Sequence, residues 1–404
     1  MTRYFATAML AALFLAPLAL APIDAQGPGG GGAAKLHRQG ARAIPNQYIV
    51  VFKDDATMAR GDHAAVLGRM NAVLRGRGAV PEHVYADAIR GFSAFMSEED
   101  ARAIAADPAV AFVEEDSIME AIVTQSNATW GIDRVDQRNR PLSGTYTYTS
   151  TGSGVTAYVI DTGIRRTHTQ FAGRAVSGFT AINDGRGSTD CNGHGTHVAG
   201  TIGGSTYGVA KGVRLVAVRV LSCSGSGSTS GVIAGVNYVS GNHTGTAPAV
   251  ANMSLGGGVS SALDTAVSNS ISDGVTYAIA AGNSNANASN FSPARVAAAI
   301  TVGSSTSTDA RSSFSNFGSV VDIFAPGSSI TSAWSTNDTA TRTISGTSMA
   351  TPHVAGTAAR YLQGNPGAAP ATVRNALVAD ATTNVLSGIP SGTANRLLFR
   401  LGTQ

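Results

Sequence analysis

Short apolar runs alternate with helical patterns along most of the chain from Trp130 onward. Strands are predicted over residues 155–161, 214–221, 249–255, 275–282, 297–304 and 320–327. Helices are predicted over residues 228–240 and 261–272, and a further helix opens at Thr347. This alternation predicts an α/β fold, a parallel sheet with helices on both faces. A functional site is therefore expected at the carboxyl ends of the strands.

Residues 44–120 follow a different pattern and carry most of the charge clusters, whereas the later residues are rich in Gly, Ser and Thr. Strands are predicted over residues 46–52, 91–96 and 109–116. Helices are predicted over residues 55–76 and 97–106, the second opened by a capping box of Ser97 and Asp100. These elements predict a small α+β unit, and the change in composition predicts a domain boundary after it.

The N-terminus has the pattern of a secretory signal peptide, predicted over residues 1–25 and followed by a flexible Gly-rich segment over residues 26–43. Arg3 precedes an apolar run over residues 9–21, and Ala19, Ala21 and Ala25 offer cleavage sites. The alternative is a membrane anchor, but the run is short for a bilayer span and a Gly tract follows it. We therefore expect a secreted, extracellular protein with no membrane association after signal cleavage.

Secretion would expose the two cysteines, Cys191 and Cys223, to oxidising conditions. In an oxidising compartment a lone pair of cysteines commonly forms one disulfide, which would contribute about 3 to 4 kcal/mol in the chain-entropy model. The alternative is a pair of buried free thiols. Elsewhere composition says less: the 404 residues carry a net charge of +3, and the scattered Lys and Arg residues give no footprint for nucleic acid.

Three motifs carry candidate chemistry. Asp161 ends a predicted strand in "VIDTGI", His194 lies in "CNGHGTHVAGTIGG", and Ser348 lies in "GTSMATPHVAG". Each alone has a simple structural explanation: a turn residue, a packed core histidine and a helix N-cap. Together they supply a nucleophile, a base and a carboxylate that orients the base, in the order Asp, His, Ser that is typical of subtilisin.

With these motifs the chain resembles the subtilisin-like serine proteases (subtilases), most closely the proteinase K and aqualysin branch, from Ile44 to the C-terminus. The resemblance implies a subtilisin-like parallel sheet, preceded by a ferredoxin-like α+β propeptide. It also implies that Asp161 orients the imidazole, that His194 acts as general base and then general acid, and that Ser348 attacks the scissile carbonyl. No cofactor is expected for catalysis.

The helix after Ser348 explains why a nucleophile would lie there, because its unpaired N–H groups favour an oxyanion. Pro352 is expected to be tolerated because the first helical turn has spare N–H groups. Asn283, in "AAGNSN", resembles the family's oxyanion asparagine; the alternative is a simple turn residue.

Two glycine-rich edges are expected to hold substrate by backbone pairing, which gives broad selectivity, and a small-residue pocket is expected to favour apolar or aromatic P1 residues. The alternative is that these glycines only form loops. The edge residues are Gly225, Gly227, Ser254, Leu255 and Gly256, and the pocket residues are Ala280, Ala281 and Gly282.

The sequence offers two candidate metal sites, a zinc site that is not favoured and a calcium site that is. His194 and His197 are spaced like zinc ligands, but the H-E-x-x-H glutamate is absent. The resemblance implies structural Ca²⁺ held by the Asp322 carboxylate and the carbonyls of Ala297 and Ala299. The sequence departs from the proteinase K pattern here, where Pro and Val stand in place of the two alanines.

The resemblance also implies a self-processing zymogen. Residues 44–122 would be an inhibitory propeptide that aids folding, residues 123–404 the catalytic domain, and cleavage would fall near Ile122 and Val123. The alternative for the first unit is a permanent accessory domain. The predicted activity is a monomeric serine endopeptidase acting on proteins and peptides. Alternatives are a catalytically inactive binding protein of the same fold and an esterase, although the G-x-S-x-G elbow is absent.

Overall fold

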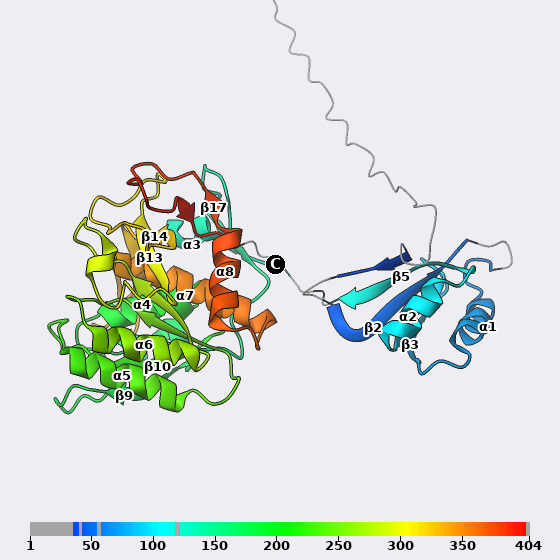
Figure 1. The fold of residues 1–404 in the computed structure, drawn as a ribbon, viewed down its shortest axis with the longest axis horizontal. Coiled ribbons are helices and arrows are strands. Elements are labelled where there is room, and N and C mark those ends of the chain that lie inside the picture. Colours follow the sequence, from blue (N-terminus) through cyan, green and yellow to red (C-terminus); the bar gives the residue numbers. More distant parts are fainter. Residues whose placement is uncertain (1–34, 40–42, 55–57, 118, 120–121, 401–404) are drawn as a thin grey trace, which may run out of the picture. The chain divides into compact units, whose positions relative to one another are not determined.

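Two units make up the chain, the first ending at Met119 and the second beginning at Glu120 (Figure 1). The structure is a computed structural model, which describes residues 35–39, 43–54, 58–117, 119 and 122–400. The predicted signal peptide lies outside the described residues, as do residues 26–34 and 40–42 of the Gly-rich segment. Within the described residues, no helix is both long enough and apolar enough to cross a bilayer.

The first unit is a five-stranded sheet of order β1-β5-β2-β4-β3 with two helices. Without β1, the chain order β-α-β-β-α-β and this strand order are those of a ferredoxin-like fold, as predicted. Its core includes Val50, Phe92, Ile104 and Val113. The elements are β1 (Leu36–His37), β2 (Ala43–Phe52), α1 (His63–Leu74), β3 (Val80–Tyr85), β4 (Gly91–Phe95), α2 (Glu98–Ala105) and β5 (Val110–Ser117).

One helix prediction for this unit was wrong, and one strand was missed. The helix predicted over residues 55–76 begins only at His63, because Asp62 accepts the Ala65 N–H at 2.9 Å as an N-cap and Gly61 before it has a φ of +85°. Residues 55–57 lie outside the described part. Strand β3 was not predicted, since its first four residues are all exposed and show no apolar alternation.

The second unit is built on a nine-stranded sheet of order β17-β18-β14-β13-β12-β11-β8-β10-β9, in which every described strand except β17 runs parallel to its neighbours. This confirms the predicted α/β class. The strands are β8 (Thr156–Asp161), β9 (Ala175–Thr180), β10 (Arg214–Arg219), β11 (Ala249–Met253), β12 (Thr276–Ala280), β13 (Ile300–Ser305), β14 (Ile323–Pro326), β17 (Thr382–Thr383) and β18 (Arg396–Leu397).

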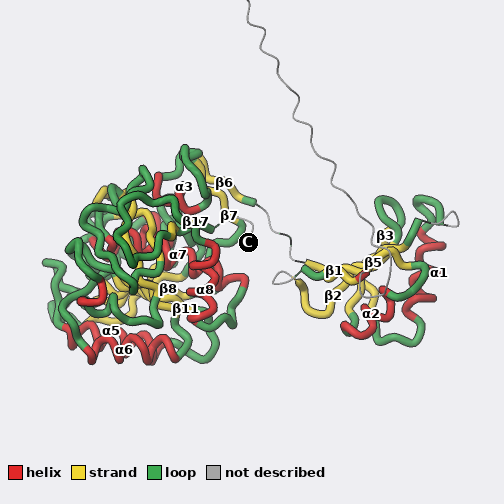
Figure 2. Tube along the Cα trace, turned by 45° about the horizontal axis from the view of Figure 1, so that its top comes forward, coloured by secondary structure: helices red, strands yellow, loops and turns green. Residues whose placement is uncertain are grey.

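Helices cover both faces of this sheet, and α5 and α6 lie side by side on one of them (Figure 2). Successive residues of β8 show the two layers: Ala157 and Val159 pack with α4 and α7, whereas Tyr158 and Ile160 pack with α5 and α6. The alternation arises because side chains point to opposite faces along a strand. The helices are α3 (Trp130–Val135), α4 (His194–Gly203), α5 (Thr229–Asn242), α6 (Ser261–Ser272), α7 (Thr347–Gly364) and α8 (Pro370–Asp380).

Two small antiparallel pairs complete the unit: β6 (Val123–Ser126) with β7 (Thr145–Tyr148), and β15 (Ile330–Ala333) with β16 (Thr341–Ile344). Neither pair was predicted, nor were β9 and α8. Several predicted strands were also longer than the observed ones. The strand predicted from residue 297 starts at Ile300, after a turn in which the Ala299 N–H donates to the Val296 carbonyl at 3.1 Å.

In the main sheet β8 lies between β10 and β11, so the direction of winding changes there. Ligands bind at such switch points in α/β sheets.

Candidate active site

Asp161 is the last residue of β8 and is fully buried. Its Oδ1 atom lies 2.7 Å from His194 Nδ1 and accepts the Thr162 N–H at 2.7 Å. Its Oδ2 atom has no hydrogen-bond partner among the described residues. The carboxylate is therefore fixed through one oxygen, and that oxygen faces the imidazole.

His194 is the first residue of α4, and close packing forces glycine on both sides of it. Gly193 has a φ of +111°, and a Cβ there would lie 2.3 Å from the Trp334 ring. A Cβ on Gly195 would lie 2.2 Å from the Gly163 carbonyl oxygen. Only glycine fits both positions, so the chain can bring His194 against the end of β8.

The environment of His194 favours its protonated form. Burial alone lowers its pKa, but the negative charge of Asp161, the hydrogen bond to Asp161 and the charge of Asp190 together raise the pKa above the usual value. The side chain is 25% exposed, so the ring is open to a cavity. This is the electrostatic arrangement that a general base needs when it must hold a proton transiently.

Ser348 is the second residue of α7, where backbone N–H groups have no intrahelical acceptor. Its Oγ atom donates to the Ser254 carbonyl at 3.1 Å. In the part of the chain that the structure describes, this hydroxyl makes no hydrogen bond to the His194 ring. The structure therefore joins Asp161 to His194 directly, whereas the Ser348 hydroxyl bonds Ser254, the residue that follows β11.

Pro352 was predicted to be tolerated because the first helical turn has spare N–H groups, and this reason was wrong. Pro352 is not in the first turn, and its missing N–H would otherwise have bonded the Ser348 carbonyl, four residues earlier. That carbonyl instead accepts the Ser254 hydroxyl at 2.8 Å, and the Ser254 hydroxyl also accepts Asn252 Nδ2 at 2.9 Å. Proline thus frees a carbonyl that joins α7 to the end of β11.

Asn283 follows β12, and its side-chain orientation is fixed. Its Oδ1 atom accepts the Thr347 N–H at 2.8 Å and the Thr347 hydroxyl at 2.9 Å. The amide nitrogen is thereby turned away from Thr347, and Asn283 lines the same cavity as Ser348. Asn283 and the start of α7, where Ser348 lies, therefore line one cavity.

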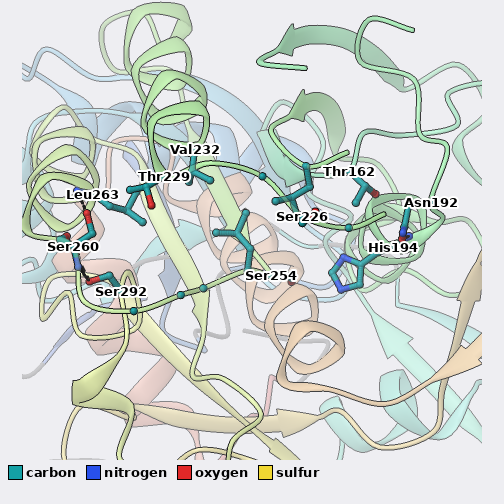
Figure 3. A pocket seen from close by; sticks show the side chains of 17 residues that line it. Thr162, Asn192, His194, Ser226, Thr229, Val232, Ser254, Ser260, Leu263 and Ser292 are labelled. Carbon is teal, nitrogen blue, oxygen red and sulfur yellow. Dashed lines mark hydrogen bonds between the residues drawn. The ribbon is translucent and has the colours of Figure 1, made fainter. Parts of the chain in front are cut away.

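Two neighbouring cavities, of about 410 Å³ and 310 Å³, share the segment from Leu255 to Gly258. Figure 3 looks into the larger one, with His194, Asn192 and Thr162 at one end and Ser260, Leu263 and Ser292 at the other. All the substrate residues expected from sequence line them. Gly225, Gly227 and Ser254 line the larger cavity, Ala280, Ala281 and Gly282 line the smaller, and Leu255 and Gly256 line both.

Cys191 and Cys223 form the expected disulfide, with an S–S distance of 2.06 Å. Asn192 Nδ2 reinforces the link by donating to the Cys223 carbonyl at 2.9 Å. The bridge ties the loop before His194 to the segment that carries Gly225. Asp184 lies near both sulfur atoms, but sulfurs in a disulfide are not thiolate ligands, so this group is no metal site.

His197, the other member of the zinc spacing, is fully buried. Its Nε2 atom lies 3.0 Å from the Ile330 carbonyl and 3.1 Å from the Arg342 carbonyl, and burial lowers its pKa to about 4. A ring nitrogen held by two carbonyls must donate a proton to them and cannot bind a cation. Nε2 of His197 is therefore not available as a metal ligand.

The residues expected to hold Ca²⁺ do not fit that ion in this arrangement. Asp322 Oδ2 accepts the Thr301 N–H at 2.8 Å, and Oδ1 accepts the Arg374 guanidinium. Calcium requires several free oxygen ligands, whereas here an arginine cation already occupies one carboxylate oxygen. Ala297 is exposed and Ala299 buried in the turn that precedes β13.

Sequence reasoning missed two groups at the site, the hydroxyl of Ser254 and the carboxylate of Asp190. The Ser254 backbone was expected to bind substrate, but the bond from its hydroxyl to the Ser348 carbonyl was not expected. Asp190, which is 5% exposed, accepts hydrogen bonds around His194. An aspartate three residues before "GHG" was the signal that could have found it.

Comparisons with known proteins identify the family to which this chain belongs. The model of the Subtilase family matches residues 152–402, and the model of Peptidase inhibitor I9 matches residues 47–121. An extracellular serine proteinase of Thermus sp. (strain Rt41A) is 54% identical over 91% of this chain and 92% of its own length. Alkaline serine exoprotease A of Vibrio alginolyticus is 54% identical over 89% of this chain and 68% of its own length. A solved cold adapted subtilisin-like serine proteinase is 61% identical, with a TM-score of 0.66 over 68% of this chain and 99% of its own.

Proposed function

Because this chain belongs to the subtilase family of serine proteases, we propose that Asp161, His194 and Ser348 hydrolyse peptide bonds through an acyl-enzyme. The observation that carries the proposal is the 2.7 Å contact between Asp161 Oδ1 and His194 Nδ1; His194 lines the larger of two neighbouring cavities, and Ser348 lines the smaller. The contact fixes the ring so that Nε2 faces the cavity as a base.

The first step requires one local movement. Rotation of Ser348 about its Cα–Cβ bond breaks the 3.1 Å bond to the Ser254 carbonyl and turns the hydroxyl toward His194. His194 Nε2 takes the hydroxyl proton as the oxygen adds to the scissile carbonyl, and Asp161 stabilises the imidazolium that forms. His194 then gives the proton to the leaving amine. Water repeats the sequence on the acyl-enzyme and releases the acid.

The oxyanion is stabilised by the Asn283 amide and by the Ser348 N–H at the start of α7. The fixed Asn283 Oδ1 atom supports this role, because it leaves only the amide nitrogen for the cavity. Asn283→Ala should lower kcat by about 10²- to 10³-fold with little change in KM, a magnitude that comes from subtilisin itself. A variant that keeps the wild-type kcat would remove Asn283 from the mechanism.

Substrate binding is proposed to use the edges at Gly225 to Gly227 and Ser254 to Gly256, which line opposite sides of the larger cavity (Figure 3). Backbone pairing ignores side-chain identity, so selectivity is broad. The smaller cavity, lined by Ala280, Ala281 and Gly282 together with Phe291, is uncharged and suits an apolar or aromatic P1 side chain. A preference for Lys or Glu at P1 in a peptide library would contradict this.

We infer that the protein is a secreted precursor whose first unit inhibits the second until cleavage near residues 122 and 123. The inhibitor-type match over residues 47–121 and the apolar N-terminal run support this. N-terminal sequencing of protein secreted by the native host should find a start near Val123. A mature protein that still begins near residue 26 would contradict the processing.

Structural Ca²⁺ at Asp322 stays a prediction from the family resemblance, and binding would require Arg374 to leave the carboxylate. Arg374→Ala should therefore bind Ca²⁺ more tightly than the wild type in titration calorimetry. Absence of binding by both proteins would remove this site from the account.

The proposed reaction is tested by comparing the processed wild type with Ser348→Ala on casein. The variant is expected to release no peptide fragments beyond the uncatalysed background. Because it cannot process itself, its precursor should be cleaved with a trace of wild-type enzyme that is then inactivated by a sulfonyl fluoride. Equal activity in both proteins would refute the assignment.

A further inference from the structure

Asp190 lies in the loop between β9 and α4, is 5% exposed and does not touch the reacting atoms. Its Oδ1 atom accepts the N–H groups of Asn192 and Gly193 and the Thr162 hydroxyl, all at 2.9 Å. Its Oδ2 atom accepts the Thr196 N–H at 3.0 Å and the Thr196 hydroxyl at 2.6 Å. Both oxygens of a buried charge are thus satisfied, by donors from residues 192–196 and by Thr162.

The donors lie on either side of His194. Gly193 precedes it and Thr196 follows two residues later, while the Gly195 N–H between them donates to the Thr162 hydroxyl at 2.9 Å. Thr162 is the residue after Asp161. One carboxylate therefore connects the end of the strand that carries Asp161 to the start of the helix that carries His194.

We propose that Asp190 is a positioning residue for the reaction proposed above, on which this inference rests, and that its hydrogen bonds hold the His194 ring in register with Asp161. Among the described residues, the ring itself makes one hydrogen bond, to Asp161 Oδ1. Its orientation otherwise depends on the backbone that Asp190 holds. A displacement of about 1 Å at a reacting group can cost about 10²-fold in rate, so this backbone has to be rigid.

The electrostatics of the site support the same role. The charged and titratable groups around the His194 ring are Asp161 at the end of β8, Asp190 in the loop, and His197 one turn along α4. Burial lowers the pKa of His197 to about 4, so His197 is neutral near neutral pH. The Asp190 charge adds to that of Asp161 in raising the pKa of His194.

Asp190 could instead be a purely structural cap for the loop, and a matched control separates the two roles. Asp133 is also buried, at 2% exposure, and accepts the Gly144 N–H at 2.7 Å and the Ser143 hydroxyl at 3.0 Å. In the described part of the chain it makes no hydrogen bond to a residue of the site. Asp133→Asn and Asp190→Asn make the same change, because an amide cannot accept hydrogen bonds at both of its terminal atoms.

The experiment measures kcat, KM and the pH midpoint of kcat/KM on a peptide anilide, with each processed enzyme normalised by active-site titration. Asp190→Asn should lower kcat by about tenfold or more, leave KM within about twofold, and move the midpoint to lower pH. Asp133→Asn should lower only the melting temperature. If Asp190→Asn matches Asp133→Asn in kcat and in midpoint, the proposal is overturned.

Thr162→Val decides the question if Asp190→Asn accumulates as unprocessed precursor. It removes the Thr162 bond to Asp190 and the acceptor of the Gly195 N–H, but keeps the Asp190 charge. Its kcat should fall while the pH midpoint stays at the wild-type value; a wild-type kcat would overturn the proposal. If the proposed function itself were wrong, a different variant would show it: Ser348→Ala would keep full activity.

Discussion

The bond between the Ser254 hydroxyl and the Ser348 carbonyl gives a prediction that depends on Pro352. Because Pro352 has no N–H, the Ser254 hydroxyl is the donor that satisfies the carbonyl, at 2.8 Å. The same hydroxyl accepts Asn252 Nδ2 at 2.9 Å. Ser254→Ala should therefore leave two buried groups unpaired, the Ser348 carbonyl and the Asn252 amide.

The expected magnitude follows from these two groups. Each unpaired buried polar group costs about 1–3 kcal/mol, so Ser254→Ala, which leaves two, should lower the free energy of unfolding by about 2–6 kcal/mol. In a Pro352→Ala background the new N–H can bond the Ser348 carbonyl, and only the Asn252 amide is then left unpaired. The cost of Ser254→Ala should fall to about half, a coupling of about 1–3 kcal/mol between the two positions.

The assay is chemical unfolding of the four processed proteins, each inactivated with a sulfonyl fluoride so that self-digestion does not distort the curves. Unfolding free energies from the wild type, the two single variants and the double variant give the coupling directly. If Ser254→Ala costs the same in both backgrounds, the Ser348 carbonyl does not depend on the Ser254 hydroxyl, and the explanation for the buried proline is wrong.

Two further predictions concern charge. Asp161→Asn should lower kcat by about 10⁴-fold with an unchanged melting temperature, because a neutral amide cannot stabilise the imidazolium of His194; a kcat near that of the wild type would remove Asp161 from the mechanism. Burial lowers the pKa of His197 and of His353 to about 4, so their contribution to stability is full above about pH 6.5 and is lost as the pH falls toward 4. Asp136, whose pKa burial raises to about 6, acts in the opposite direction, as do His194 and Asp322, whose pKa values are also raised. We expect the two histidines, both held neutral by burial, to dominate. The urea midpoint of inactivated enzyme should therefore be lower at pH 5 than at pH 7, and an equal or higher midpoint at pH 5 would contradict this.

Much of the main sheet was predictable because its strands are buried on both faces and read as continuous apolar runs. Residues 155–161 and 249–255 correspond to β8 and β11, and helix α6 lies at its predicted bounds of Ser261–Ser272. Strands such as β16 were missed because they are exposed. Every residue from Thr341 to Ile344 is at least partly exposed, so this segment has no run of apolar residues that would predict a strand.

The site was predictable where residue type carries the chemistry, as for Asp161 and His194. It was not predictable where backbone groups carry it. Nothing in the sequence shows that five donors converge on Asp190, since three of them are backbone N–H groups that every residue but proline has. The same limit explains the error about Pro352, whose effect lies in a freed carbonyl and not in its own side chain.

The central claim is that the Ser348 hydroxyl becomes a nucleophile by passing its proton to His194. The most direct measurement is the rate at which a phosphonylating reagent modifies Ser348 in the processed enzyme, followed by mass spectrometry across pH and compared with His194→Ala. The account predicts modification at Ser348 alone, with a rate that rises as His194 loses its proton above its raised pKa and that collapses in the variant. Modification elsewhere, or a rate at Ser348 that is independent of both pH and His194, would contradict it.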